Sequence, residues 1–173
     1  MRRARSTETA AVLKIEGQPI IGPFDSHHGL SLRLILFDLD IARWRGFIMV
    51  KSVLIVDDNP IVRNALCELL AREEDFDVCG EAENGREAIE RARQLCPDLI
   101  VTDLSMPVMD GLEEARLLKE VMPAVPVIIY TAHSDPFIEK EARSAGASAV
   151  ISKSEAVATL VKTARSLCDQ LAA

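Results

Sequence analysis

From residue 51 onward, short apolar runs typical of strands alternate with segments whose apolar residues recur at helical spacing. The runs of strand type cover residues 53–56, 77–81, 99–102, 127–130 and 149–152. The segments of helical spacing cover residues 59–70, 85–95, 112–121 and 136–145, and a last one follows residue 154. Five strands that are each followed by a helix predict an α/β fold, a doubly wound five-stranded parallel sheet of the (βα)5 type.

Local signals support the predicted helix ends. Pro60 suits the first turn of the first helix, and Pro97 follows the second helix as a stop. Gly146 is expected to terminate the fourth helix, and Ser154 can provide the N-cap of the last one.

Side chains capable of chemistry stand where four of the strands end. Asp57 and Asp58 follow the first strand, Asp103 the third, Thr131 the fourth and Lys153 the fifth. In an open parallel α/β sheet, ligands bind at the carboxyl ends of the strands. One edge of the sheet is therefore expected to gather three carboxylates, a hydroxyl and an ammonium group.

Such a cluster has few chemical uses. Two carboxylates about 4 Å apart repel by roughly 4 kcal/mol at an effective dielectric near 20, so three of them need a counter-ion or a retained proton. Few carboxylates combined with a phosphate suit Mg²⁺, which keeps several of its waters. Lys153 can pair with a carboxylate or with a phosphate. One aspartate could act as a nucleophile and become an aspartyl phosphate.

Between residue 50 and about residue 171 the chain resembles the receiver domain of two-component response regulators. The resemblance rests on four segments in order, residues 56–58, 101–111, 130–132 and 151–153. It implies a flavodoxin-like sheet with strand order 2-1-3-4-5. It also implies a phosphoacceptor in a phosphorelay, supplied by a histidine kinase or a histidine phosphotransfer protein, that switches a face binding a downstream protein. The resemblance implies no enzymatic activity beyond the domain's own phosphorylation and dephosphorylation.

The resemblance assigns roles to the acidic residues. Asp103 is the expected phosphoacceptor. Asp58, Asp103 and the backbone carbonyl of Ser105 are expected to bind Mg²⁺ directly, and Asp57 through water. The duties of Asp57 and Asp58 could also be exchanged.

Further roles follow from the same resemblance. Thr131 and Lys153 are expected to contact phosphoryl oxygens. Ser105 and His133 occupy positions that tune the rate of dephosphorylation in the family, although His133 could equally be an ordinary loop histidine. Val150 departs from the family pattern, which usually has Tyr or Phe at this switch position.

Because valine is short and stiff about its first torsion, signal output is expected to depend on backbone shifts and not on an aromatic swing. The expected partner or homodimer surface is the face of the fourth helix, the fifth strand and the fifth helix.

Charge is unevenly distributed along the chain. Residues 1–48 hold seven basic and five acidic side chains, whereas residues 49–173 hold 13 basic and 22 acidic ones, a formal charge of −9. This acidic part argues against a nucleic-acid surface of its own. No apolar run is long enough for a membrane span, and four cysteines without a Cys-x-x-Cys pair fit a reduced, cytoplasmic protein.

Residues 1–48 show no clear helical period and are expected to be a disordered extension, or a wrongly assigned start, before a stand-alone receiver at 49–173. One alternative is a receiver fragment of a DNA-binding regulator that lacks its output domain. A remote alternative is a phosphohydrolase of the haloacid-dehalogenase type, because Asp38 and Asp40 follow an apolar run. Ala42 departs from that family's pattern, and too few residues follow before the receiver begins.

Overall fold

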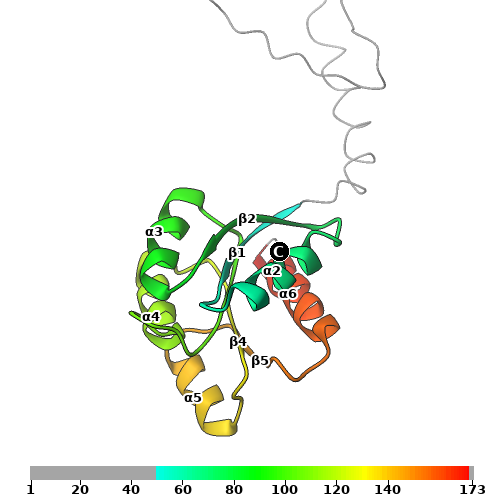
Figure 1. Cartoon of the computed structure of the whole chain (residues 1–173). Coiled ribbons are helices and arrows are strands. Elements are labelled where there is room, and N and C mark those ends of the chain that lie inside the picture. Colours follow the sequence, from blue (N-terminus) through cyan, green and yellow to red (C-terminus); the bar gives the residue numbers. More distant parts are fainter. Residues whose placement is uncertain (1–49, 172–173) are drawn as a thin grey trace, which may run out of the picture. The chain divides into compact units, whose positions relative to one another are not determined.

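Five parallel strands form one sheet in the computed structural model, which describes residues 50–171 (Figure 1). The strands are β1 (Lys51–Val56), β2 (Phe76–Ala82), β3 (Leu99–Thr102), β4 (Val127–Thr131) and β5 (Ala149–Ser152). The helices are α2 (Pro60–Leu70), α3 (Gly85–Leu95), α4 (Gly111–Val121), α5 (Pro136–Ser144) and α6 (Val157–Leu171). The sheet order β2-β1-β3-β4-β5 confirms the predicted fold and the strand order that the resemblance implied.

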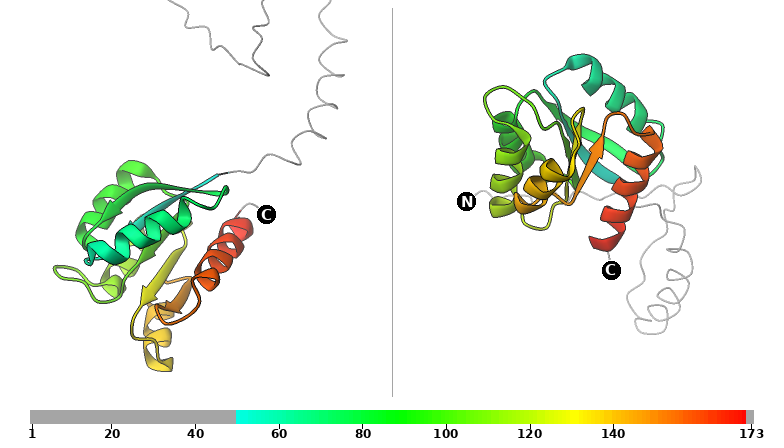
Figure 2. Two further views of the ribbon diagram at one scale, coloured as in Figure 1. Left: turned by 45° about the vertical axis from the view of Figure 1, so that its right-hand side comes forward. Right: turned by 90° about the horizontal axis from the view of Figure 1, so that it is seen from below.

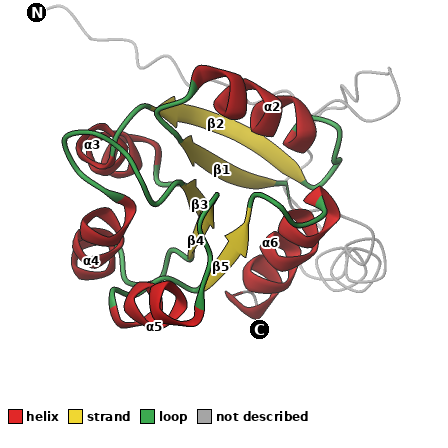
Figure 3. Cartoon of the chain, turned by 60° about the horizontal axis from the view of Figure 1, so that its bottom comes forward, coloured by secondary structure: helices red, strands yellow, loops and turns green. Residues whose placement is uncertain are grey.

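Alternate side chains of each strand pack on opposite faces of the sheet, as strand geometry requires. Val53 and Ile55 of β1 pack in a core cluster with residues of α2 and α6. Leu54 and Val56 pack on the other side, with residues of α3 and α4. Helices α2 and α6 thus cover one face, and α3, α4 and α5 the other (Figures 2 and 3). Burial on both faces explains why β3, β4 and the last four residues of β1 are almost continuously apolar.

The strand register brings the polar strand ends together. Val56 of β1 is paired with Thr102 of β3, so the next residue of each strand, Asp57 and Asp103, leaves the sheet at the same level. The Asp103 amide also donates to the Val56 carbonyl at 2.9 Å. The predicted convergence of the strand ends is therefore a direct result of the β1–β3 pairing.

The helix termini agree with most of the local signals. Asn59 caps α2, its side chain accepting from the Ile61 amide at 2.9 Å, and Pro60 occupies the first turn as predicted. The predicted cap at Ser154 is wrong, because α6 begins only at Val157. Ser154 instead belongs to the turn after β5.

Residues 50–171 hold the whole sheet, and no helix among them is long and apolar enough to cross a membrane. The extension predicted for residues 1–48, including Asp38 and Asp40, lies outside the described residues.

A chain that begins at Met49 is expected to unfold within a few degrees of the full chain, because five paired strands and two apolar core clusters lie after that residue. Thermal unfolding of both chains, followed by circular dichroism, measures the difference. A loss of several kcal/mol in the shorter chain would show that residues 1–48 pack on the domain.

Candidate functional site

Three carboxylates meet at the carboxyl edge of the sheet. Asp57, Asp58 and Asp103 each place a carboxylate oxygen within 4.8 Å of the others. Asp57 and Asp103 are buried, with exposed fractions of 1% and 8%, while Asp58 is exposed. The sequence predicted this cluster, and the structure brings all three residues together.

Lys153 supplies a cation to this cluster from the turn after β5. Its Nζ donates to Asp57 Oδ2 at 2.7 Å and lies 3.2 Å from Asp103 Oδ1. Its amide donates to the Thr131 carbonyl at 2.7 Å, which ties the lysine to the end of β4. Burial alone would lower the pKa of Lys153, but the hydrogen bond to Asp57 and the Asp103 charge outweigh it, so the pKa is raised. The ammonium therefore stays charged between two carboxylates.

Asp103 is the least satisfied of the three carboxylates. Burial raises its pKa, and the nearby Lys153 charge offsets this only in part. Its buried Oδ1 accepts no hydrogen bond from any described residue, because the Lys153 contact lacks hydrogen-bond geometry. A buried anionic oxygen without a donor is stabilised by a bound cation. The donor set thus fits a hard divalent ion such as Mg²⁺.

The other predicted residues lie on β4, on β5 and on the loops that follow β3 and β4. Thr131 is buried at the end of β4, and its hydroxyl oxygen accepts from the His133 amide at 3.2 Å. The residues Ser105 and His133 are exposed on loops. Val150 is partly buried on β5 and packs against the small cluster that contains Ile129 of β4. The structure therefore places Val150 beside α5, away from the carboxylates.

The loop after Asp103 has a constrained shape. Val108 has a φ of 71°, a left-handed conformation that is strained for a β-branched residue, and it is 73% exposed. The Met109 amide donates to the Pro107 carbonyl at 2.8 Å, which closes a tight turn around Val108. Residues of this loop, including Ser105, line an open groove together with Asp58. A ligand on the carboxylates would therefore face this loop.

Arg63 was not identified from the sequence. Its side chain is 11% exposed, and its Nη1 donates to the Asp57 carbonyl at 2.7 Å. Its Nε donates to Glu81 at 3.0 Å and its Nη2 to Glu83 at 3.2 Å. The sequence did contain one signal of this role, because Arg63 is a basic residue near the start of α2, where the helix dipole favours acidic side chains. Only its contacts outside the helix show that it fixes the backbone at Asp57.

Glu114 was also missed. It is fully buried on α4, and its Oε2 lies 2.7 Å from the Thr102 hydroxyl oxygen. Burial raises its pKa to about 8. The available signal was helical spacing, because Glu114 stands four residues before the buried Leu118, whereas Glu113 faces solvent.

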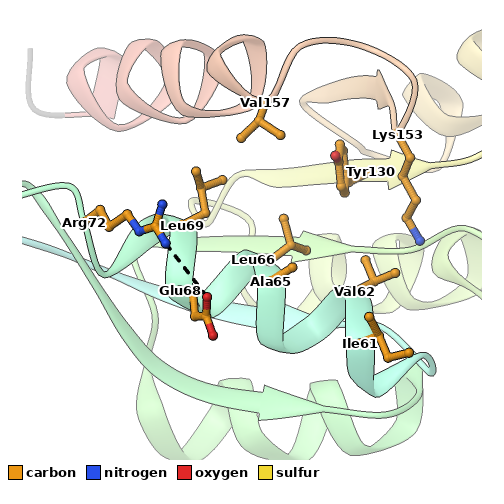
Figure 4. A pocket seen from close by; sticks show the side chains of 10 residues that line it. All are labelled: Ile61, Val62, Ala65, Leu66, Glu68, Leu69, Arg72, Tyr130, Lys153 and Val157. Atoms are coloured by element: carbon orange, nitrogen blue, oxygen red, sulfur yellow. Dashed lines mark ion pairs between the residues drawn. The ribbon is translucent and has the colours of Figure 1, made fainter.

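An apolar pocket of about 410 Å³ lies between α2 and the start of α6 and reaches Lys153 (Figure 4). Tyr130 lines the pocket beside the lysine, with its ring centroid 6.0 Å from Lys153 Nζ. Two exposed aliphatic side chains line the pocket, Ile61 at 77% and Val157 at 43%. Exposed apolar surface beside a site is a candidate contact for a partner protein.

Comparisons with known proteins agree with this geometry. The family model of the response regulator receiver domain matches residues 53–165. The transcriptional regulatory protein LnrK of Bacillus subtilis is 40% identical over 114 residues, which are 66% of this chain and 51% of LnrK. The chemotaxis protein CheY of Halobacterium salinarum is 41% identical over 105 residues, 61% of this chain and 86% of CheY.

A solved structure gives the same result. A LuxR-family two-component response regulator from Aurantimonas sp. superposes with a TM-score of 0.68 at 31% identity, covering 70% of this chain and 86% of that one. The present chain thus spans about half the length of LnrK and most of CheY. Fold, acidic cluster and sequence similarity lead to one conclusion: this chain belongs to the response regulator receiver domain family of two-component signalling.

Proposed function

We propose that this protein is a phosphoacceptor response regulator that takes a phosphoryl group from a phosphohistidine onto Asp103 in the presence of Mg²⁺. One observation carries the proposal. Asp103 is buried beside two further carboxylates and the Lys153 ammonium, yet its Oδ1 has no hydrogen-bond partner among the described residues. A ligand at this oxygen would replace its ion pair with Lys153, and the neighbouring carboxylates and the ammonium supply the charges to hold that ligand.

The contacts of Asp57 support a division of roles. Its Oδ2 accepts from Lys153 at 2.7 Å and its Oδ1 from the Asn59 amide at 2.9 Å, so both oxygens are already engaged. Asp58 is exposed at the mouth of the site. We assign direct Mg²⁺ binding to Asp58, Asp103 and the Ser105 carbonyl, and binding through water to Asp57.

In the proposed transfer, a carboxylate oxygen of Asp103 forms a bond to phosphorus while the bond between phosphorus and the donor's imidazole nitrogen breaks. Bound Mg²⁺ would supply neutralising charge on the phosphoryl oxygens. Lys153 would move from the carboxylates toward a phosphoryl oxygen, and the Thr131 hydroxyl would donate to another. Positioning and charge neutralisation are most of what phosphoryl transfer requires of a protein.

The test is direct phosphorylation of the full chain. Incubation with acetyl phosphate and Mg²⁺ is expected to add one phosphoryl group, measured by intact mass, and chelation of Mg²⁺ with EDTA should prevent it. If the folded protein remains unmodified with Mg²⁺ present, the proposed function is wrong.

Asp58→Ala is expected to weaken Mg²⁺ binding and slow phosphorylation, and to leave the free energy of unfolding unchanged or higher. The reason is that one of three mutually repelling carboxylates is removed from an exposed position. Titration with Mg²⁺, the phosphorylation rate and chemical denaturation measure the three effects. Asp169→Ala, at an exposed position on α6, is the matched control. Unfolding of the Asp58 variant would instead show a structural role.

The partners would be a histidine kinase or histidine phosphotransfer protein and a downstream protein. We expect modest changes on phosphorylation over α5, β5 and α6, because Val150 cannot switch between buried and exposed poses as an aromatic ring does. Amide chemical shifts with and without a phosphoryl mimic such as beryllofluoride measure this. Large shifts confined to another face would contradict the expectation.

A second function is favoured by one observation, the match to half of the transcriptional regulator LnrK. This chain would then act as the receiver part of a DNA-binding regulator, with the DNA-binding domain elsewhere. In a gel shift, the second function requires that a separate DNA-binding protein recruits the phosphorylated chain to DNA, whereas the first requires no complex with DNA. The formal charge of −9 on residues 49–173 favours no binding by the receiver itself.

A further inference from the structure

Glu114 lies beneath the strand end that carries the proposed phosphoacceptor, and the proposed chemistry makes no use of it. We propose that Glu114 is a positioning residue for Asp103: its protonated carboxyl donates to the Thr102 hydroxyl, which in turn donates to the Asp103 backbone carbonyl. The part that this relay plays in phosphorylation rests on the proposed function. The relay itself is a property of the fold.

The distances define the relay. Thr102 Oγ1 lies 2.7 Å from Glu114 Oε2 and 3.2 Å from the Asp103 carbonyl oxygen. A hydroxyl has one hydrogen to donate, while its oxygen can also accept. If Thr102 donated to an ionised Glu114, the Asp103 carbonyl would face a hydroxyl oxygen without a hydrogen between them. A protonated Glu114 satisfies both contacts, because it donates and leaves the threonine hydrogen for Asp103.

The surroundings of Glu114 favour the protonated form. The side chain is fully buried on α4, and its Oε1 has no hydrogen-bond partner among the described residues. Burial of an unpaired charge is far more costly than burial of a neutral acid, which agrees with a pKa raised to about 8. An apolar side chain would fill this space without the cost of desolvating a carboxyl group. Packing alone therefore does not account for a carboxyl at this position.

The helix that carries Glu114 is packed directly on the Asp103 backbone. A Cβ atom at Gly111, the first residue of α4, would overlap the Asp103 carbonyl. The Gly111 amide donates to the Leu104 carbonyl at 3.0 Å. A Cβ atom at Gly85 would lie 2.9 Å from the Glu114 Cβ, so α3 closes the same space. With so little free space, the Glu114–Thr102 contact fixes where the Asp103 backbone lies relative to α4.

The test compares three single variants with the wild type. Glu114→Gln keeps the shape and can donate from its amide to Thr102, whereas Glu114→Leu fills the space but cannot donate. Glu113→Leu, at the exposed neighbouring position, is the control. At saturating Mg²⁺ and fixed acetyl phosphate, we expect Glu114→Leu to slow phosphorylation about tenfold, because small misplacements of reacting groups are costly. Glu114→Gln should stay within about twofold of wild type, as should Glu113→Leu.

Thr102→Val provides an independent arm if Glu114→Leu does not fold. It removes the hydroxyl and should slow phosphorylation by a similar factor. Where both single variants fold, the double variant with Thr102→Val and Glu114→Leu should be phosphorylated only slightly more slowly than either of them. The effects of two substitutions in one hydrogen-bond network are not additive. Wild-type rates in Thr102→Val or in folded Glu114→Leu would overturn the proposal.

Two NMR signals test the relay without any phosphoryl transfer. In wild type at pH 6.5, the Glu114 carboxyl carbon should have the chemical shift of a protonated acid. The Asp103 carbonyl carbon should shift in Thr102→Val but stay near its wild-type position in Glu114→Gln. The relay would be overturned if Glu114 is ionised, or if the chemical shift of the Asp103 carbonyl carbon is unchanged in Thr102→Val. If wild type shows both NMR signals but accepts no phosphoryl group, the relay stands and the proposed function fails.

Discussion

Asp103→Asn is expected to accept no phosphoryl group under conditions in which the wild type accepts one. An amide oxygen carries no negative charge, so the substitution removes the nucleophile and one proposed Mg²⁺ ligand together. The fold should be retained, because asparagine has the same shape and one of three crowded carboxylates is lost. Intact mass after incubation with acetyl phosphate and Mg²⁺ measures the outcome.

Asp110→Asn is the matched control for that experiment. Asp110 lines the groove beside Asp58 and caps α4 by accepting from the amides of Leu112 and Glu113, a role that asparagine can also fill. This variant should be phosphorylated like the wild type. Stable, stoichiometric labelling of the Asp103 variant at another residue would show that the phosphoacceptor was assigned incorrectly.

The surroundings of the acidic residues are the reason that we propose Asp103, and not Asp57, as the phosphoacceptor. Both oxygens of Asp57 accept hydrogen bonds, one from Lys153 and one from the Asn59 amide. Asp103 is the carboxylate with a buried oxygen that lacks a hydrogen-bond partner in the described part of the chain. Either oxygen of Asp57 would have to break its hydrogen bond before it could attack a phosphorus atom, whereas Oδ1 of Asp103 would give up its ion pair with Lys153.

The strand ends could be predicted from the sequence because each buried run is followed at once by a polar residue with its own chemistry. Parallel pairing then decides which of them meet, and the register of Val56 with Thr102 places Asp57 beside Asp103. The strand order came from the resemblance and not from periodicity. The fold class and the convergence of the polar strand ends were therefore predictable from a short-range pattern, whereas the strand order was not.

Contacts between distant segments could not be predicted in the same way. Arg63 acquires its role from acidic side chains at and just beyond the end of β2, 18 and 20 residues later in the chain. Ser154 has the residue type of a cap, but its hydroxyl lies 2.7 Å from that of Ser152 in the turn before α6. Glu114 and Glu113 are identical in type, and only the orientation of α4 separates a buried acid from an exposed one. Residue type and local spacing did not predict the role of a side chain whose contacts lie in another element of the fold.

Glu114→Gln is expected to raise the free energy of unfolding relative to wild type by an amount that grows as the pH rises. In the folded protein the pKa of Glu114 is about 8, against an ordinary value of 4.5 for an exposed glutamate. Between these values the unfolded chain releases the proton and the folded protein keeps it. The folded state thus binds more protons, so the wild type loses stability with rising pH, by about 1.4 kcal/mol per pH unit. The loss between pH 4.5 and pH 7 is about 3 kcal/mol, and it levels off above pH 8.

Glutamine does not titrate, so the variant escapes this loss, and its amide can donate to the Thr102 hydroxyl, which lies 2.7 Å from Oε2 in the wild type. Chemical denaturation of both proteins at pH 5, 6, 7, 8 and 9 measures the difference, in which the titration of all other groups cancels because the two chains share them. Glu113→Gln, at an exposed position, is the control and should change the free energy of unfolding only slightly. A pH-independent difference for Glu114→Gln would mean that Glu114 has the same protonation state in the folded and unfolded chains. The raised pKa, and with it the protonated carboxyl next to Thr102, would then be wrong.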